Sequence, residues 1–170
     1  MIFQSFYHTP PGFDDLLMRS DGEVLTELRF VKAYDAENTQ RDLPIFQEVS
    51  RWLDCYFAGN EPDFTPEYKL EGATPFRQEV LEWVRRIPFG ETMTYGEIAA
   101  RIAQRHATGT MSAQAVGGAV GWNPICIIIP CHRVIGAHNK LTGYSGGMEN
   151  KIALLKNEEL RSKTIVHSKW

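Results

Sequence analysis

The chain has 170 residues, of which 43% are hydrophobic and 23% are charged, and these ordinary globular values exclude a disordered or fibrous chain. No stretch reaches the roughly 18 consecutive apolar residues of a membrane span. The first residues show no basic segment before an apolar run, so we expect no signal peptide. Three cysteines, Cys55, Cys126 and Cys131, do not suit a disulfide framework and favour a reducing compartment.

The net charge of −3 is distributed unevenly between the two parts of the chain. Residues 1–70 carry 13 acidic and 6 basic side chains, a charge of −7, whereas residues 71–170 carry 8 acidic and 12 basic side chains, a charge of +4. No Asp or Glu occurs between Ile98 and Met148. A surface that faces phosphates would have this composition, because each carboxylate would repel the polyanion. A buried apolar stretch would have it too, and charge alone leaves both interpretations open.

The first part of the chain predicts a small α/β domain. Three segments have the composition of strands: 2–8, 16–18 and 22–31. Asp21-Gly22 is a typical hairpin turn between the last two. Apolar residues from Ile45 to Tyr56 recur at helical spacing, and Gly59-Asn60 ends that helix. Residues 61–71, with two prolines, predict a linker.

The second part predicts mainly helices. Thr74 is a good N-cap with Pro75 at the first helical position. Thr94 and Glu97 form a capping box that opens a short helix, and another helix is expected to follow from Ser112 to Val120. Two short helices joined by a polar turn indicate a helix-turn-helix. Three later segments are expected in order: a buried extended run over 125–129, a glycine-rich loop over 142–147 and a helix over 148–157.

The helix expected after Ser112 is unusual because it contains Gly117-Gly118. Each glycine inside a helix costs about 1 kcal/mol relative to alanine. A face of small residues lets the backbone approach either a neighbouring helix or a narrow groove of DNA closely. Reading bases in the major groove needs several Arg, Asn or Gln side chains, and this segment has only Gln114. Contact with DNA would therefore use the minor groove, with little sequence reading.

Cys131 follows a β-branched run and stands beside His132 and Arg133. A buried cysteine is usually inert packing, but cationic neighbours lower the pKa of a thiol and favour its nucleophilic form. Adjacent residues rarely face each other, so coupling to His132 would need a bridging water or a bend. Cys126 lies five residues earlier, which is not zinc-ligand spacing, and we expect it in the core and no metal site.

These motifs resemble the signature of the O6-alkylguanine-DNA alkyltransferases, also called methylated-DNA–protein-cysteine methyltransferases. The resemblance rests on Asn123-Pro124, Pro130 to Ile135, Gly143 to Gly147 and Glu158. It implies an α+β fold with two domains, 1–72 and 73–170. The first would be a ribonuclease H-like α/β domain with a three-stranded antiparallel sheet and a linker. The second would be mainly helical, with a winged helix-turn-helix.

The function implied by the resemblance is DNA repair by direct transfer of an alkyl group from O6 of guanine, or O4 of thymine, to Cys131. The transfer would be irreversible, would consume the protein and would need no cofactor. The partner would be double-stranded DNA that contains O6-alkylguanine, bound through its minor groove. The protein would act as a monomer in the cytoplasm, or in the nucleus of a eukaryote.

The resemblance also assigns roles to single residues. His132 and Glu158 form an activating relay, with a water between the imidazole and the thiol. Asn123 braces the turn that presents the cysteine, and Tyr95 donates a proton to the departing guanine. The pocket for the base includes Val134, Tyr144 and Ser145. The residues implied in DNA contact are Thr94, Gln114, Ala115, Gly118, Ala119 and Arg133.

Two features depart from the family. The family usually has an arginine that fills the gap left by the flipped base, where this chain has the shorter, uncharged Gln114. We therefore expect weaker DNA affinity and slower base flipping than in a typical member. The turn from Arg105 to Met111 is also longer than usual, and Trp122 could lie in the core or face DNA.

Three other functions compete with repair. A lesion sensor of the alkyltransferase-like class would lack the cysteine, so the presence of Cys131 favours catalysis. A winged-helix regulator would need more base-reading side chains. A cysteine hydrolase would need a distant histidine and an oxyanion hole, and neither can be assigned in this chain.

Overall fold

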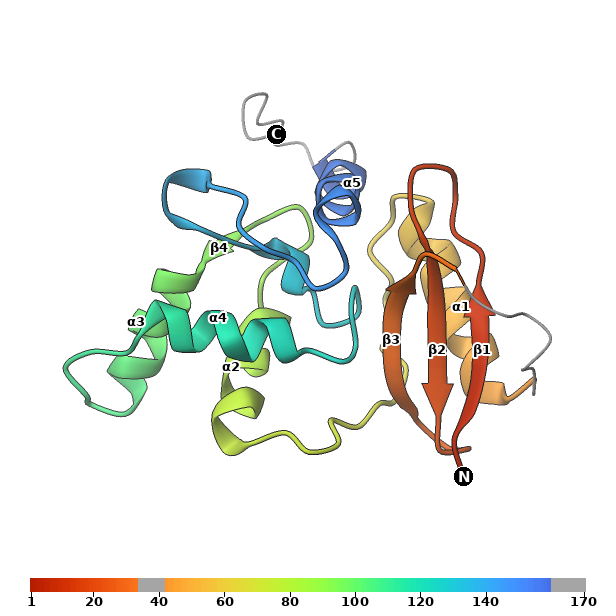
Figure 1. Cartoon of the computed structure of the whole chain (residues 1–170), viewed down its shortest axis with the longest axis horizontal. Coiled ribbons are helices and arrows are strands. Elements are labelled where there is room, and N and C mark those ends of the chain that lie inside the picture. The colour runs from red at the N-terminus through yellow and green to blue at the C-terminus, as the bar shows by residue number, and fades with distance from the viewer. Residues whose placement is uncertain (34–41, 160–170) are drawn as a thin grey trace.

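The computed structural model describes residues 1–33 and 42–159. Figure 1 shows a sheet with one helix on one side of the molecule and a group of helices on the other. The sheet is antiparallel in the order β1-β2-β3, which confirms the three strands expected from the sequence. Its strands are β1 (Phe3–Tyr7), β2 (Asp15–Ser20) and β3 (Leu25–Val31).

Helix α1 (Pro44–Phe57) covers the sheet. Proline at its first turn needs no amide partner there, and Gly59, with φ of +89°, supplies the left-handed conformation that ends it. Its buried stripe runs from Ile45 to Tyr56, as the helical spacing predicts. Tyr56 is completely buried and faces the second half of the molecule.

The linker segment is attached to the sheet. The amide of Leu25 donates to the carbonyl of Glu67 at 3.0 Å, and the amide of Lys69 donates to the carbonyl of Leu25 at 3.0 Å. These bonds form an isolated parallel bridge between Leu25 and Tyr68. The proline-containing segment therefore adds a short pairing to the edge of β3.

The second half is built from four helices and a two-stranded parallel sheet. Its elements are α2 (Pro75–Arg85), β4 (Met93–Thr94), α3 (Tyr95–Arg105), α4 (Ala113–Trp122), β5 (Val134–Ile135) and α5 (Met148–Glu159). The predicted caps are confirmed: the side chains of Thr74 and Ser112 each accept a backbone amide, and Thr94 with Glu97 forms the complete capping box. Local sequence thus places the helix-turn-helix of α3 and α4.

The apolar run 125–129 is buried but not extended, so that prediction is wrong. It forms a turn in which the amide of Ile129 donates to the carbonyl of Ile125 at 3.1 Å. Ile127 has φ of +66°, a conformation that a β-branched residue adopts only under strain. Pairing with a sheet is limited to Ile125, which bridges Leu28 of β3.

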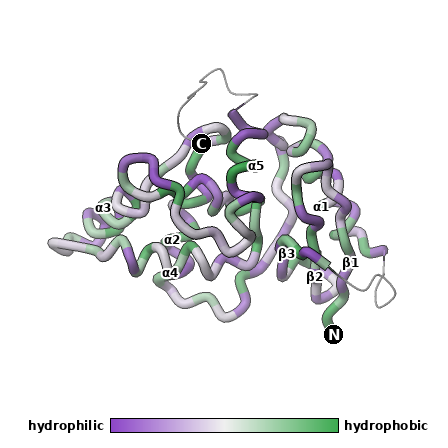
Figure 2. The backbone as a smooth tube through the Cα atoms, turned by 45° about the horizontal axis from the view of Figure 1, so that its top comes forward, coloured by the Kyte–Doolittle hydropathy of each residue, from purple (hydrophilic) through white to green (hydrophobic). Residues whose placement is uncertain are grey.

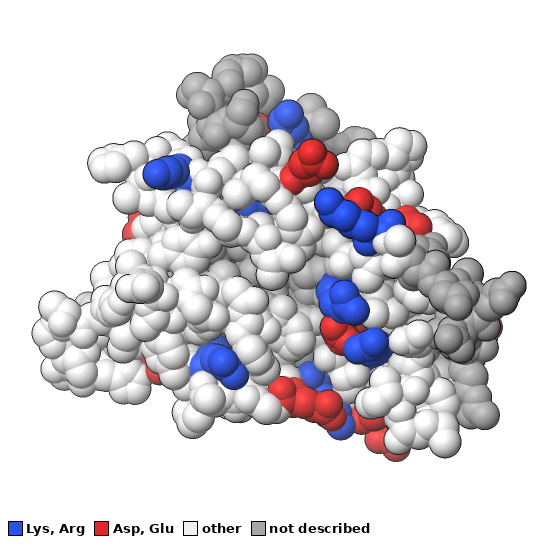
Figure 3. Space-filling view, viewed as in Figure 1, with Lys and Arg blue, Asp and Glu red and all other residues white. Residues whose placement is uncertain are grey.

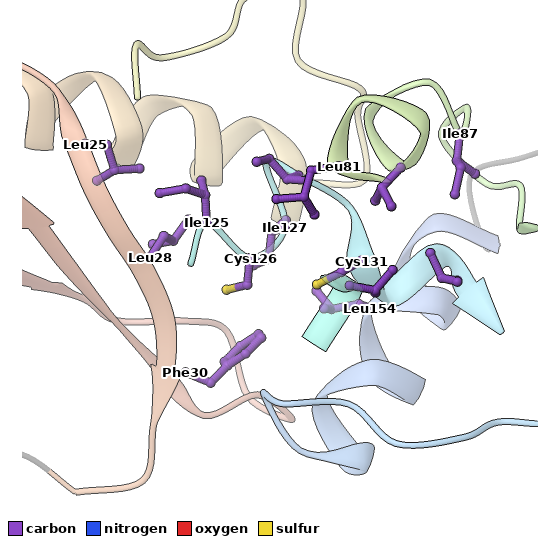
Figure 4. Close-up of a cluster of buried hydrophobic side chains, with 14 of the residues drawn as sticks. Leu25, Leu28, Phe30, Leu81, Ile87, Ile125, Cys126, Ile127, Cys131 and Leu154 are labelled. Atoms are coloured by element: carbon purple, nitrogen blue, oxygen red, sulfur yellow. The ribbon is translucent and has the colours of Figure 1, made fainter. Parts of the chain in front are cut away.

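One continuous core joins the two halves. The amide of Leu28 donates to the carbonyl of Pro124 at 2.8 Å, and the amide of Cys126 donates to the carbonyl of Leu28 at 2.9 Å. Figure 4 shows Leu28 and Phe30 of the sheet on the side of this core that faces Cys126. No helix among the described residues is long and apolar enough to cross a membrane. The tail over 162–170 lies outside the described residues.

Candidate active site

The turn that leads to Cys131 is held by the side chain of Asn123. Its amide nitrogen donates to the carbonyls of Ile125 at 3.3 Å and Ile129 at 3.0 Å, and its oxygen accepts from the amide of Ile125 at 3.0 Å. These three bonds offset the strain at Ile127, which is of the order of 1–3 kcal/mol. Asn123 therefore braces the segment that presents the cysteine.

Cys131 opens a short 3-10 turn and is only 3% exposed. Its side chain nevertheless lines a cavity of about 540 Å³ between α3, α4 and the loop that precedes α5. Small-molecule sites have volumes of roughly 300–1,000 Å³, so the cavity can hold a nucleobase. The lining residues are Thr94, Tyr95, Gly96, Ala113, Gln114, Gly117, Val120, Gly121, Cys131, Ala137, Thr142, Gly143, Tyr144 and Ser145.

Burial raises the pKa of the Cys131 thiol above its ordinary value. The Asn123 amide, the nearby Tyr144 hydroxyl and the charge of Lys151 oppose this effect without reversing it. The resting thiol is therefore protonated at neutral pH. The sequence-based expectation of a thiolate stabilised by its cationic neighbours is wrong, because desolvation dominates and the guanidinium of Arg133 is paired elsewhere.

His132 and Glu158 lie together in the interior, 0% and 1% exposed. The His132 Nε2 atom is 2.6 Å from the Glu158 Oε1 atom. Burial alone would raise the pKa of Glu158, but His132 and Arg133 hold it well below its usual range. The carboxylate is thus ionised and faces one nitrogen of the imidazole, which fixes the tautomer that carries its proton on Nε2.

Burial lowers the pKa of His132 below its ordinary value of 6.5, and the attraction of Glu158 only partly offsets this effect. Arg133 and Lys151 add to the lowering. The imidazole is therefore neutral at neutral pH. Its Nδ1 atom is buried and has no hydrogen-bond partner among the described residues, which leaves one nitrogen lone pair free to accept a proton.

Arg133, which the resemblance places in contact with DNA, is only 9% exposed. Its guanidinium donates three hydrogen bonds of 2.9 to 3.1 Å to Glu158 and one of 2.8 Å to the carbonyl of Ile87. The amide of Gly90 adds a bond of 3.1 Å to the same carboxylate. A buried carboxylate requires such compensation, and this requirement holds Arg133 inside.

The loop before α5 forms one wall of the cavity. Tyr144 and Ser145, the residues that the resemblance implies for the base pocket, line it. A methyl group on Gly146 would stand 2.8 Å from the Tyr144 ring and 2.9 Å from the Phe30 ring. Phe30 belongs to β3, so the N-terminal sheet supports this wall of the cavity.

Val134, which the resemblance places in the base pocket, is not among the residues that line the cavity. Its side chain is fully buried, because β5 runs through the core. Its carbonyl accepts a hydrogen bond of 2.7 Å from Lys151 Nζ, which also donates to the carbonyl of Thr142 at 3.1 Å. Burial lowers the pKa of Lys151 to about 8. Lys151 therefore ties the cavity loop to β5.

Tyr95 lines the cavity from the first turn of α3. Burial raises the pKa of its phenol, which interacts with both Thr142 and Cys131, so the phenol is a neutral proton donor at neutral pH. Thr94 also lines the cavity. Its hydroxyl accepts the Glu97 amide at 3.0 Å as the cap of α3.

Helix α4 presents Gln114, Ala115 and Gly118 to the exterior. Figure 2 shows this helix as a mostly white and green trace, in keeping with its low polarity. Ala119, which the resemblance also implies in DNA contact, is only 4% exposed and lies one helical position away, on the core side. Trp122 is half-buried against the core, and its ring lies 4.8 Å from the Arg77 guanidinium.

The surface over α3 and α4 is mostly uncharged in the view of Figure 3. Both helices lie largely in the acid-free part of the sequence, between Ile98 and Met148. A polyanion could therefore approach this face without meeting a row of carboxylates.

Sequence reasoning missed Tyr56 and Lys151. Tyr56 donates to Glu158 Oε1 at 2.8 Å, from a helix that lies 102 residues earlier in the chain. The one available signal was a hydroxyl within the apolar stripe of α1, and this hydroxyl needs a partner once it is buried. Lys151 gave no such signal, because a lysine in an amphipathic helix is usually exposed.

Comparison with known proteins matches both halves of the chain. Residues 2–70 match the ribonuclease-like domain of 6-O-methylguanine DNA methyltransferase, and residues 75–160 match its DNA-binding domain. A methylated-DNA–protein-cysteine methyltransferase of Haemophilus influenzae is 43% identical over 94% of this chain and 87% of its own. The enzyme of the same name from Mycobacterium tuberculosis is 45% identical over 95% of both chains.

Solved structures agree with these relatives. The O6-methylguanine methyltransferase of Mycobacterium tuberculosis has a TM-score of 0.78 at 41% identity and covers 96% of both chains. The OGT of the same organism in complex with DNA has a TM-score of 0.76 at 42% identity and covers 95% of this chain and 94% of its own. The two-domain α+β fold is therefore confirmed. The chain belongs to the 6-O-methylguanine DNA methyltransferase family.

Proposed function

We propose that this protein repairs DNA by moving an alkyl group from O6 of guanine to Cys131, once per molecule. The observation that carries the proposal is the position of the Cys131 thiol. It lines a cavity of about 540 Å³ that suits a base, and the neutral imidazole of His132 follows it in the chain, hydrogen-bonded to Glu158. Relatives at 43–45% identity carry the name of this activity.

The chemistry forms an S–C bond and breaks the bond between the alkyl carbon and O6. The thiol proton passes through a water to Nδ1 of His132, the one imidazole nitrogen that Glu158 does not engage. Guanine leaves as an anion and takes a proton from the phenol of Tyr95, which lines the same cavity. Asn123 positions the cysteine, and Tyr144 and Ser145 enclose the base.

Double-stranded DNA that contains the lesion is the proposed partner. The exposed small residues of α4, Ala115 and Gly118, suit close contact in the minor groove, with Thr94 and Gln114 in the lining of the cavity. The base rotates out of the stack to reach Cys131. We extend the proposal to O4 of thymine, to a monomer with a domain boundary near residue 72, and to the cytoplasm or, in a eukaryote, the nucleus.

The competing functions predict different outcomes. A lesion sensor would bind damaged DNA without a covalent change, and a winged-helix regulator would bind one undamaged sequence. A thiol that lines a base-sized cavity disfavours the sensor. The single polar side chain within α4 disfavours the regulator. The family of the chain argues against a hydrolase.

The test is incubation with a short duplex that contains O6-methylguanine, followed by intact-mass analysis. We expect the protein to gain one methyl group. Cys131→Ser should gain none, whereas Cys126→Ser, which changes a buried cysteine outside the cavity lining, should still gain it. Binding without a mass change, or equal labelling of the Cys131→Ser variant, would contradict the proposal.

A further inference from the structure

The N-terminal domain supplies a side chain to the proposed relay. Tyr56 lies near the C-terminal end of α1, and its hydroxyl donates to Glu158 Oε1 at 2.8 Å. The same hydroxyl is 3.5 Å from His132 Nε2, and the residue is 0% exposed. This contact brings together three residues from three separate elements: α1, the turn at Cys131 and α5.

The ring of Tyr56 is held on several sides. Trp52 stacks on it with ring centroids 5.6 Å apart, and Phe57 and Phe89 meet it edge to face at 5.4 and 6.1 Å. Its carbonyl accepts a bond of 3.1 Å from the side-chain amide of Asn157, next to Glu158. Both the ring and the main chain of Tyr56 are thus fixed relative to α5, so its hydroxyl has one position.

Glu158 Oε1 receives several donors at once. His132 Nε2 approaches it at 2.6 Å, Tyr56 at 2.8 Å, and two nitrogens of Arg133 at 2.9 and 3.1 Å. Each donor withdraws negative charge from the oxygen that faces the imidazole. A carboxylate with fewer donors would attract the proton of His132 more strongly and would favour the imidazolium.

We infer that Tyr56 is a positioning residue for the relay: its hydroxyl holds Glu158 in line with His132 and weakens that carboxylate enough to keep the imidazole neutral. The inference rests on the proposed function, in which a neutral His132 takes the thiol proton. The charged and titratable groups that act on His132 are Glu158 and Lys151 of α5, Arg133 of its own turn and Tyr56 of α1, and Cys131 precedes it in that turn. Among these, Tyr56 belongs to the N-terminal domain.

The test is Tyr56→Phe in the full chain, with Tyr7→Phe as the matched control. Tyr7 also donates to a carboxylate from the N-terminal domain, Asp54 at 2.7 Å, but this pair is exposed and away from the relay. Single-turnover methyl transfer is measured from pH 5 to 8.5. We expect the acid limb of Tyr56→Phe to move up by about 0.5 pH unit or more, which is about a threefold loss of rate on that limb. Tyr7→Phe should match the wild type.

A second readout does not depend on transfer. Titration of the His132 ring by NMR, in protein without DNA, should give a higher pKa in Tyr56→Phe than in the wild type. Replacing Tyr56 by 3-fluorotyrosine keeps the ring and the hydroxyl but strengthens the donor, so it should move the acid limb in the opposite direction. This replacement also tests the inference should Tyr56→Phe fold poorly.

The inference is overturned by an unchanged acid limb and an unchanged His132 titration, even when Tyr56→Phe lowers the melting temperature. That result would leave Tyr56 as a structural residue only. A wild type that gains no methyl group would instead contradict the proposed function, and the titration would still decide whether Tyr56 controls the protonation of His132.

Discussion

Replacing Glu158 by glutamine removes the one carboxylate in the buried network of His132, Arg133 and Tyr56. Arg133 would keep its charge, with its side chain only 11% exposed and without its counter-ion. Breaking a buried pair in this way costs about 3–5 kcal/mol. A chain of this size loses about 2–4 °C per kcal/mol, so the melting temperature should fall by roughly 6–20 °C.

Glu27→Gln is the matched control, because Glu27 pairs with Arg19 and Arg29 at the surface, where the arginine side chains are 40–50% exposed. Such a pair contributes at most about 1 kcal/mol. Thermal unfolding of both variants checks the difference, and equal losses would refute the reasoning. The lowered pKa of Glu158 also predicts a pH dependence. Its stabilisation of the fold is complete above the unfolded pKa of about 4.3 and is lost as the pH falls further. The difference in melting temperature between Glu158→Gln and the wild type should therefore narrow at those pH values.

Four further changes test separate parts of the site. Gln114→Arg adds a cation to the cavity lining, so duplex affinity and repair rate should rise. The salt dependence of binding should steepen by about 0.9 in log–log slope. No gain in affinity or rate would contradict the expected weakness of DNA binding. Gly146→Ala should cost about 1–3 kcal/mol and slow transfer, because its methyl group meets two rings. Gly109→Ala, outside the cavity lining, has free space and should change neither. Asn123→Ala breaks three hydrogen bonds and should lower the free energy of unfolding by about 3 kcal/mol in denaturant titration; a loss below about 1 kcal/mol would show that the turn does not depend on them. The rate of transfer should stay constant between pH 8 and 6.5, the ordinary pKa of histidine, and should decrease at lower pH. The pKa of His132 is lowered, and the protonated ring cannot act as a base. A flat rate profile from pH 5 to 8 would exclude that role.

The features that sequence predicted well are those decided within a few residues. The Thr94–Glu97 capping box and the N-caps at Thr74 and Ser112 follow from side chains that bond to amides three residues away. The strands follow from alternation and the hairpin turn at Gly22, whose φ is +113°. The cysteine and its loop followed from a resemblance, which supplied what periodicity could not.

The features that sequence missed depend on distant partners. Residues 125–129 have the composition of a strand, but Asn123 bonds to two of their carbonyls and one amide, and these bonds replace a sheet ladder with a turn. Arg133 is a residue type that often contacts DNA, and its buried position could not be predicted because it depends on a carboxylate 25 residues later in the chain. The protonated state of Cys131 was missed for the same reason: burial raises the pKa of its thiol and outweighs the charges of its neighbours in sequence.

The acidic N-terminal half carries none of the cavity-lining residues, yet it contacts the proposed active site at three places. Tyr56 bonds to the relay, Phe30 packs against the cavity loop at Gly146, and Asp14 exchanges two hydrogen bonds with Asn150. Asn150 also donates to the carbonyl of Gly146 at 2.7 Å. These three contacts add partners from the N-terminal half to the carboxylate, which His132, Arg133 and Gly90 also hold, and to the wall of the cavity. We therefore expect a change in the N-terminal sheet or in α1 to affect the proposed relay and the cavity wall through these partners, although neither element lines the cavity.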